Sequence, residues 1–484
     1  MADQTTARIL VASNRGPVSF SKAQDGSLTL RRGGGGLVSG LSAIDDPNAV
    51  WVCAALGEAD REAARRSPSG RLDRGGFDVG GQAVRMLDID PGIFDRAYNG
   101  VANSTLWFVH HLLYDTPVSP AFDADFREQW SAFEAYNAAF AEALAAEAAP
   151  GAAVLVQDYH LALAPALLRA LRPDLRIGYF SHIPWAPADY FRLLPDDVAA
   201  AVLTGVLGAD RAGFHTRRWA AAFADCCADL LGAEVDRADL SVSFQGRTTR
   251  LGVHSLGADG EFLRERSHRP DVDERLAALR AAAGDRRTIV RVDRTELSKN
   301  IVRGLLAYRH LLRTRPEWHE RVVHIAFAYP SRQDLAEYRS YTAEVTRLSA
   351  EINAEFATDG WQPLILQVED DFARSLAAYR LADVALVNPI RDGMNLVAKE
   401  IPVVSEGGCA LVLSREAGAY HELAEDSLVV NPYDVVGTAD ALHRALAMPV
   451  DERTERTKRL AAAATALSPQ QWFLDQLAEL TEQS

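Results

Sequence analysis

The sequence NPIRDGMNLVAKE at residues 388–400 decides the fold. It follows a largely apolar run, residues 382–387, which predicts a buried strand, and Asp392-Gly393 predicts a tight turn. Good helix formers begin at Asn395, so the stretch predicts a strand, a turn and the start of a helix. The unpaired N–H groups of a first helical turn, together with the helix dipole, form a site for an anion such as phosphate. An ordinary α/β connection would show the same spacing.

A second stretch favours the phosphate interpretation. Residues 288–293 (TIVRVD) predict another short strand, and Arg294 and Lys299 follow it. Cations just past a strand end lie at the edge of a parallel sheet where open α/β folds bind ligands. Lysine acts on phosphate as a point charge and arginine as a planar fork. Two such sites in one half of the chain indicate a diphosphate.

Composition limits the class of protein. A chain of 484 residues, 48% hydrophobic and 24% charged, predicts a globular protein with more than one domain. The net charge of −15 argues against general binding to nucleic acid or to an anionic membrane, because both need a basic face. A local basic pocket for a small phosphorylated molecule is compatible with this charge.

Cysteine usage and the N-terminus predict a cytoplasmic location. The four cysteines fit no zinc-ligand spacing, and so few in a long chain indicate a reducing compartment. The N-terminus, MADQTTARIL, has no signal-peptide pattern. No apolar run approaches the roughly 18 residues of a membrane span, so no membrane association is expected.

The remaining pattern predicts the α/β class. Strand-like and helix-like segments alternate throughout, which implies parallel sheets covered on both faces, in two halves. Residues 257–273 are polar and charged and are expected to cross between the halves.

Four motifs of the first half are chemically ambiguous. The glycine-rich run RRGGGGLVSG at residues 31–40 can approach a sugar or a phosphate closely, but alone it is more typical of a flexible loop tip. Aromatic residues spaced like Tyr98 and Trp107 usually belong to a core. Asp158, just past a predicted strand, can accept from hydroxyl groups, whereas a lone histidine such as His182 is usually structural.

Together the motifs resemble the trehalose-6-phosphate synthase family, retaining glycosyltransferases of family 20 with the GT-B architecture. The resemblance covers residues 9–472, and RDGMNLVAKE is its most specific part. The matching motifs are SNR at 13–15, the glycines before Leu37, Tyr98 with Trp107, QDYHL at 157–161, HIPW at 182–185, GFHT at 213–216, Arg294 with Lys299, PSR at 330–332, RDGMNLVAKE at 391–400 and NPYD at 431–434.

The resemblance implies two Rossmann-like domains facing across a cleft. Residues 1–257 would bind the acceptor, residues 258–467 would bind the nucleotide sugar, and the helix at 468–484 would cross back to the first domain. The reaction would move glucose from a nucleoside diphosphate (NDP) glucose to glucose 6-phosphate, giving α,α-trehalose 6-phosphate and NDP. Relatives form dimers or tetramers, so a homo-oligomer is expected, although no interface can be identified from this sequence.

The resemblance also assigns roles to residues. Arg294 and Lys299 would hold the donor diphosphate, Asp392 would contact the glucosyl unit, and Glu400 would bind the ribose. His182 would lie at the reacting centre near the 6-hydroxyl of the donor sugar. The other donor contacts would be Gly35, Gly36, Gly393, Met394, Asn395, Leu396 and Val397. The acceptor contacts would be Arg15, Tyr98 and Arg332 on the phosphate, with Trp107 and Asp158 on the sugar.

No cofactor or metal ion is expected. The hard step is departure of a diphosphate through an oxocarbenium-like transition state, and fixed cations with helix N–H groups stabilise the growing charge. The sequence has no Asp-rich metal motif at a strand end and no evident carboxylate pair of the hydrolase kind. This fits the family's front-face mechanism, in which the leaving phosphate takes the acceptor's proton. Domain closure would exclude water from the donor.

Four departures from the family pattern bear on the substrates. Ala54 stands where the best-known synthases have an acceptor-side tryptophan, and TELSKN at residues 295–300 replaces LDYSKG. Tyr329 precedes PSR near the expected nucleotide pocket, and the segment after Glu400 looks shorter. UDP-glucose and GDP-glucose are therefore held about even as donors. The high alanine and arginine content, typical of a high-GC source, slightly favours GDP-glucose.

Two other functions stay open. A related transferase would use another phosphorylated acceptor, such as glycerol 3-phosphate or a cyclitol phosphate, and Ala54 motivates this alternative. A catalytically silent regulator that binds sugar phosphate is disfavoured, because such relatives usually lose donor residues that this chain keeps.

Overall fold

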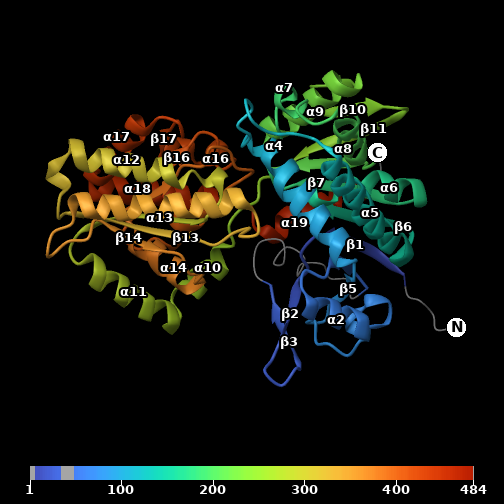
Figure 1. Ribbon diagram of the computed structural model, residues 1–484, viewed down its shortest axis with the longest axis horizontal. Helices are drawn as coiled ribbons and strands as arrows, with labels where there is room; N and C mark the ends of the chain where they lie inside the picture. The colour runs from blue at the N-terminus through green and yellow to red at the C-terminus, as the bar shows by residue number, and fades with distance from the viewer. Residues whose placement is uncertain (1–5, 34–47, 483–484) are drawn as a thin grey trace. The chain divides into compact units, whose positions relative to one another are not determined.

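The computed structural model describes residues 6–33 and 48–482. Contacts divide the chain into two compact units, Met1–Ser255 with Pro469–Ser484, and Leu256–Ser468. Figure 1 shows the C-terminal segment, α19 (Pro469–Thr481), among the elements of the first unit. Gly35 and Gly36 lie outside the described residues.

The first unit is built on a nine-stranded sheet with the order β5-β4-β1-β6-β7-β8-β11-β10-β9. All neighbouring pairs from β5 to β11 are parallel, whereas β10 pairs antiparallel with both β11 and β9. The expectation of wholly parallel sheets is therefore wrong at this edge. The strands are β1 (Ala7–Ser13), β4 (Val50–Ala54), β5 (Ala83–Leu87), β6 (Ala148–Gln157), β7 (Arg176–Ser181), β8 (Arg211–Phe214), β9 (Glu234–Asp236), β10 (Ser241–Phe244) and β11 (Arg247–Val253).

Helices cover this sheet, and a separate hairpin, β2 (Val18–Lys22) with β3 (Leu28–Arg32), follows β1. Helix α5 packs on β1 and β4, while α19 packs on β6 and β7. The helices of the unit are α2 (Glu58–Arg66), α3 (Pro91–Asp95), the π-helix η3 (Arg96–Leu106), α4 (Trp107–His111), α5 (Ala124–Glu147), α6 (Ala164–Leu171), α7 (Ala188–Phe191), α8 (Asp196–Leu207), α9 (Arg217–Leu231) and α19.

The second unit is built on a six-stranded parallel sheet with the order β14-β13-β12-β15-β16-β17. Alternate residues of β12 face different apolar layers: Val290 and Val292 join one core cluster, and Ile289 joins the other. This explains the continuous apolar strands of the sequence. The strands are β12 (Arg287–Arg294), β13 (Val322–Tyr329), β14 (Leu364–Gln367), β15 (Val384–Val387), β16 (Ala410–Ser414) and β17 (Leu428–Val430).

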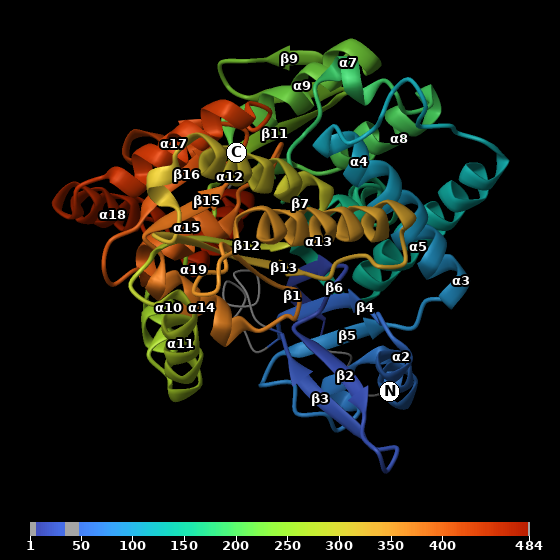
Figure 2. The same cartoon turned by 60° about the vertical axis from the view of Figure 1, so that its left-hand side comes forward.

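Helices lie on both faces of the second sheet. Figures 1 and 2 show α10, α11 and α14 together on one face, and α12 and α17 on the other. The helices are α10 (Gly260–Ser267), α11 (Pro270–Ala283), α12 (Ile301–Thr314), α13 (Ala336–Phe356), α14 (Phe372–Leu381), α15 (Leu396–Val404), α16 (Tyr420–Leu423), α17 (Val435–Ala447) and α18 (Val450–Ala464).

The stretch expected to cross between the halves, residues 257–273, lies just after the start of the second unit at Leu256 and is mostly helical, with α10 followed by the first turn of α11. The Asp259 side chain caps α10 by accepting from the Phe262 N–H. Leu263 and Val272 are buried in the core of the second unit. The two charged, exposed faces of α10 and α11 account for the polar composition that suggested a linker.

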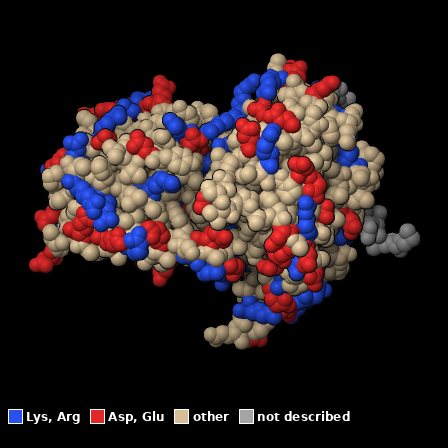
Figure 3. Space-filling view, turned by 45° about the horizontal axis from the view of Figure 1, so that its top comes forward, with Lys and Arg blue, Asp and Glu red and all other residues tan. Residues whose placement is uncertain are grey.

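The charge on the surface is mixed. Figure 3 shows lysine and arginine side chains interspersed with aspartate and glutamate on the displayed face. Within residues 6–33 and 48–482, no helix is both long enough and apolar enough to cross a membrane.

Candidate active site

The stretch at residues 388–400 forms the predicted strand, turn and helix. Helix α15 begins at Leu396, and Asn395 caps it with a left-handed backbone (φ 75°) and a side chain that accepts from the Ala398 N–H at 3.1 Å. The Asn395 side chain also donates to Asp392 Oδ2 at 3.0 Å. The cap therefore fixes Asp392 at the mouth of the helix N-terminus, and the N–H groups of Leu396 and Val397 belong to its first turn.

A second segment holds this turn in place. The Gly418 N–H donates to the Asp392 carbonyl at 3.1 Å, and the Ala419 N–H donates to the Met394 carbonyl at 2.8 Å. A Cβ atom at Gly418 would lie 1.9 Å from the Gly393 carbonyl oxygen. Only glycine allows so close an approach, so residue 418 is part of the support of the signature turn.

The end of β12 brings its cations to the same place. Lys299 ends a short 3₁₀ turn, Leu297–Lys299, and its Nζ lies 2.5 Å from Asp392 Oδ2. The Ile390 N–H donates to the Ser298 carbonyl at 2.9 Å, which fastens the two segments together. Burial by itself would lower the pKa of Lys299, but Asp392 and two further carboxylates outweigh it and raise this pKa. Arg294, at the end of β12, keeps 56% of its side chain exposed.

Asn300 fixes the end of the loop TELSKN at residues 295–300. Asn300 has a left-handed backbone (φ 59°), a conformation that asparagine tolerates better than most residues. Its side chain donates to the carbonyls of Asn388 at 3.0 Å and Pro432 at 2.7 Å. Asn300 thus takes the place of the family's glycine and adds two hydrogen bonds to the strand ends.

Glu400 lies one turn inside α15 with a partly buried side chain. Burial raises the pKa of Glu400 to about 7, and the Tyr379 hydroxyl donates to its Oε2 at 3.3 Å. Tyr329 ends the neighbouring strand β13, and its hydroxyl hydrogen-bonds that of Ser375. Tyr329 and Tyr379 therefore lie near the carboxyl ends of the strands, on the face of the sheet that α14 covers.

Arg332 follows β13 in a strained conformation. Its φ is 46°, in the left-handed region that arginine rarely adopts. The guanidinium donates to the Tyr338 hydroxyl at 2.7 Å and lies 5.5 Å over the ring of the same tyrosine. These contacts hold a cation beside the end of β12.

In the first unit, Arg15, Asp158 and His182 follow three adjacent parallel strands, β1, β6 and β7. Their common position is the carboxyl edge of the sheet, as the sequence predicts. Asp158 has a left-handed φ of 74°, and its Oδ1 accepts from the His182 backbone N–H at 3.1 Å. Arg15 is exposed, and its carbonyl accepts from the Ser13 hydroxyl at 2.6 Å.

His182 is held by neighbours that the sequence does not single out. Its Nε2 donates to Gln157 Oε1 at 2.9 Å, and its ring lies 5.6 Å from the fully buried Trp472 of α19. Burial lowers the pKa of His182 to about 4, so the imidazole is neutral at pH 7. Two sequence signals point to Gln157: its position at a strand end and its place as the first residue of the QDYHL motif.

Tyr98 and Trp107 belong to the π-helix η3 and the helix α4. The Tyr98 ring stacks on His160 at 5.6 Å, and Trp107 is buried with its ring stacked on His111 at 3.8 Å. Since His160 follows Asp158 by two residues, Tyr98 lies near the carboxyl edge of the sheet. Trp107 is consistent with the core interpretation as well as with the acceptor interpretation.

The structure therefore gathers the predicted residues into two groups, one in each unit. The first unit holds Arg15, Tyr98, Trp107, Asp158 and His182. The second unit holds Arg294, Lys299, Arg332, Asp392, Gly393, Met394, Asn395, Leu396, Val397 and Glu400. The described residues include no group of three or more histidine, cysteine, aspartate or glutamate side chains arranged to bind a metal ion.

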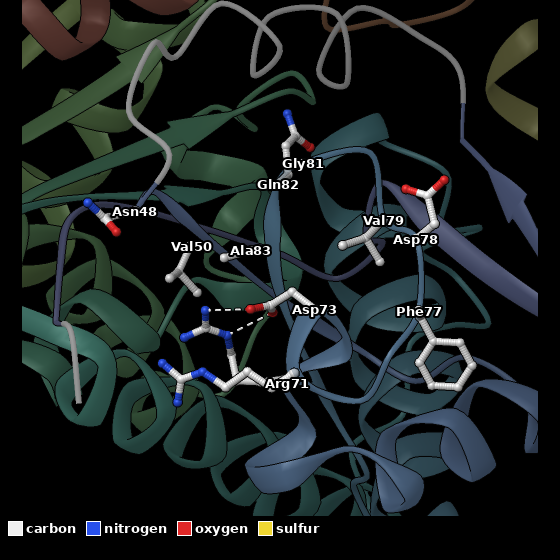
Figure 4. A pocket seen from close by; sticks show the side chains of 11 residues that line it. Asn48, Val50, Arg71, Asp73, Phe77, Asp78, Val79, Gly81, Gln82 and Ala83 are labelled. Carbon is white, nitrogen blue, oxygen red and sulfur yellow. Dashed lines mark hydrogen bonds and ion pairs between the residues drawn. The ribbon is translucent and has the colours of Figure 1, made fainter. Parts of the chain in front are cut away.

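A pocket of about 410 Å³ lies elsewhere in the first unit (Figure 4). Val50 and Ala83 line it where β4 and β5 begin, at the sheet edge opposite to Asp158 and His182. Its Arg71 is committed to Asp73 at 2.9 Å and to Glu147 at 2.8 Å. This pocket is separate from the candidate site.

Comparison with known proteins decides the family. Residues 7–482 match the sequence pattern described as Glycosyltransferase family 20. The chain belongs to this family. A trehalose-6-phosphate synthase from Mycobacterium avium is 34% identical over 97% of this family 20 chain and 95% of its own length. A bifunctional trehalose-6-phosphate synthase/phosphatase from Thermoproteus tenax is 34% identical over 94% of the chain.

The chain spans between 57% and 63% of the length of some curated relatives, the Thermoproteus tenax enzyme among them. A solved structure gives a fuller match. The UDP-forming α,α-trehalose-phosphate synthase from Burkholderia xenovorans, in complex with glucose 6-phosphate, is 27% identical with a TM-score of 0.84, over 98% of this chain and all of that one. The likeness confirms the predicted α/β fold of GT-B type.

Proposed function

We propose that this family 20 glycosyltransferase is an α,α-trehalose-6-phosphate synthase. It transfers glucose from an NDP-glucose to glucose 6-phosphate with retention of configuration and releases NDP. The names of the relatives support the reaction, and the geometry of the candidate site supports its chemistry. The observation that carries the proposal is the meeting of Lys299, Asp392 and the N-terminus of α15 at the ends of β12 and β15.

This arrangement suits a departing diphosphate. Lys299 and Arg294 supply positive charge, and the N–H groups at the start of α15 supply fixed donors, where negative charge grows on the leaving phosphate. The bond from the anomeric carbon to the β-phosphate oxygen breaks as the acceptor hydroxyl attacks the same face. The leaving phosphate takes the hydroxyl proton. Because cations already fill the role of a metal, we expect transfer to need no metal ion or other cofactor.

On the acceptor side, Arg15, Tyr98 and Arg332 would bind the 6-phosphate, and Asp158 would bind sugar hydroxyls. His182 would accept from the 6-hydroxyl of the donor sugar as a neutral imidazole, which its lowered pKa supports. Glu400 would bind the ribose. Gly35 and Gly36, which fall outside the described residues, would line the donor.

The identity of the nucleotide is a separate choice between two donors. UDP-forming relatives favour UDP-glucose, whereas Tyr329, which precedes PSR and hydrogen-bonds Ser375, departs from the family pattern and keeps GDP-glucose open. Four buried free thiols, Cys53, Cys226, Cys227 and Cys409, support a reducing, cytoplasmic location.

One observation favours a second acceptor class. Ala54 is buried at the end of β4, and its N–H donates to the Asn14 carbonyl at 3.2 Å beside Arg15. The small side chain removes an aromatic wall from the acceptor side. Glycerol 3-phosphate or a cyclitol phosphate would then be the alternative acceptor.

The experiment mixes purified protein with EDTA, UDP-glucose or GDP-glucose, and one phosphorylated acceptor, and follows NDP release. We expect release with glucose 6-phosphate and with one donor in clear preference. Turnover only with another acceptor would replace the proposal by the second one. Activity that requires added Mg²⁺ would contradict the charge argument.

A further inference from the structure

Glu296 is a fully buried carboxylate beside the candidate site. It lies two residues after β12, and none of its surface is exposed. A buried charge is costly unless cations and hydrogen bonds compensate it. Burial by itself would raise the pKa of Glu296, but nearby cations and a hydrogen bond from Ser331 lower it to about 2. Those cations are Arg294, Arg332 and Lys299.

The contacts of Glu296 join two loops. Arg294 Nη1 lies 3.1 Å from Glu296 Oε1, and the Ser331 hydroxyl donates to the same oxygen at 2.9 Å. Arg294 and Tyr329 are paired across β12 and β13, so the loops after these strands begin side by side. Glu296 therefore ties the end of β12 to the turn that carries Arg332.

Burial defines how Glu296 can act. Its Oε2 is inaccessible and has no hydrogen-bond partner among the described residues, so a ligand in solvent cannot reach it. Arg294, in contrast, is 56% exposed on the other side of the ion pair. The effect of Glu296 on a bound phosphate must pass through the cations that it holds.

We propose that Glu296 is a positioning residue, which sets Arg294 and the Ser331–Arg332 turn in place for two different phosphate groups. This inference rests on the proposed function, since Arg294 would meet the donor diphosphate and Arg332 the phosphate of the acceptor. A single internal carboxylate then fixes the spacing between the donor cation and the acceptor cation. Tyr338 holds the Arg332 guanidinium itself, and Glu296 holds the turn before it through Ser331.

Calorimetric binding of UDP, GDP and glucose 6-phosphate tests the inference without requiring turnover. Glu296→Gln keeps the size of the side chain but removes its charge. We expect about 10-fold weaker binding of the preferred nucleotide and of glucose 6-phosphate, the value of one charge-assisted contact. Glu296→Asp keeps the charge and should restore part of the affinity, which a merely space-filling role would not predict.

Glu147→Gln is the matched control. Glu147 is also a buried carboxylate between two arginines, 2.8 Å from Arg71 and 3.2 Å from Arg85. It lies in the first unit, just before the start of β6 and away from the candidate residues that follow the strand ends. Its loss should lower the melting temperature and leave all three affinities unchanged. If Glu296→Gln does not fold, Glu296→Asp alone carries the test, with a few-fold loss of both affinities expected.

A double-mutant cycle with Arg294→Ala shows whether Glu296 affects nucleotide binding through Arg294. If Glu296 acts through Arg294, its substitution should weaken nucleotide binding much less in the Arg294→Ala background than in the wild type. Wild-type affinity for all ligands in a folded Glu296→Gln protein would overturn the inference and leave the proposed function standing. A wild-type protein that bound none of the three ligands would overturn both.

Discussion

Lys299 Nζ lies 2.5 Å from Asp392 Oδ2, although 93 residues separate them in the sequence. The pair joins the loops that follow the neighbouring strands β12 and β15. It places the lysine proposed to hold the donor diphosphate next to the carboxylate proposed to contact the glucosyl unit. A bound diphosphate must therefore share Lys299 with Asp392, which sets the charge balance at the bond that breaks.

Arg294→Ala tests the diphosphate assignment with little effect on the fold. The side chain is mostly exposed, but it is one of three cations that compensate the buried Glu296, so its loss should lower the melting temperature by a few degrees and leave the fold intact. We expect transfer to fall on the order of 100-fold, because a preorganised charge on the leaving phosphate is lost. Arg313→Ala is the control: Arg313 is 52% exposed and paired with Glu355 on the face of α12. Equal rates for the two variants would contradict the assignment.

Lys299→Ala should differ from Arg294→Ala in stability. The sequence alone predicts an intact fold for both variants, but only 14% of the Lys299 side chain is exposed, and Asp392, Asp293 and Glu296 surround it. Removing the cation leaves these acids uncompensated and should cost roughly 3 kcal/mol of unfolding free energy. Denaturant unfolding measures this cost. Lys299→Ala with Asp392→Asn should recover part of it, and a purely additive double variant would argue against the coupling.

Gly418→Ala should disturb the signature turn without touching a ligand. The new methyl group would lie 1.9 Å from the Gly393 carbonyl oxygen, so the turn at residues 392–394 must shift. We expect a loss of about 1–3 kcal/mol in stability and a clear fall in kcat. Gly407→Ala is a suitable control, since a methyl group there meets nothing within 4 Å. Wild-type kcat in a stable Gly418→Ala protein would mean that the turn is not held by this contact.

Glu400→Gln should change the pH dependence of stability. The pKa of Glu400 rises from its usual 4.5 to about 7 on folding. Between these values the folded state keeps a proton that the unfolded state has released, so wild-type stability falls as pH rises through this window. Glutamine is neutral throughout. The melting temperature of Glu400→Gln relative to wild type should therefore be higher at pH 8 than at pH 5. An equal difference between the two proteins at pH 5 and at pH 8 would refute the raised pKa of Glu400.

The sequence predicts where the candidate site residues lie along the chain, but not which of them contact one another. Arg294, Lys299 and Asp392 are each predicted at a strand end, because apolar strands and turn residues are local signals. Their meeting depends on the strand order β12-β15, which no local pattern encodes. The burial of Glu296 could not be predicted for the same reason. Its charge suggests an exposed side chain, and only the packing of two loops buries it. The helix α10 was missed because its single buried stripe is hidden in a charged segment.

The most direct measurement of the central claim is the structure of the product. Glucose 6-phosphate and an NDP-glucose labelled with ¹³C at the anomeric carbon are incubated with the protein and EDTA, and the product is analysed by mass and NMR. The account predicts a disaccharide monophosphate in which the labelled anomeric carbon keeps the α configuration and is joined to the anomeric oxygen of glucose 6-phosphate. Free labelled glucose alone, or a product with a β linkage, would contradict it.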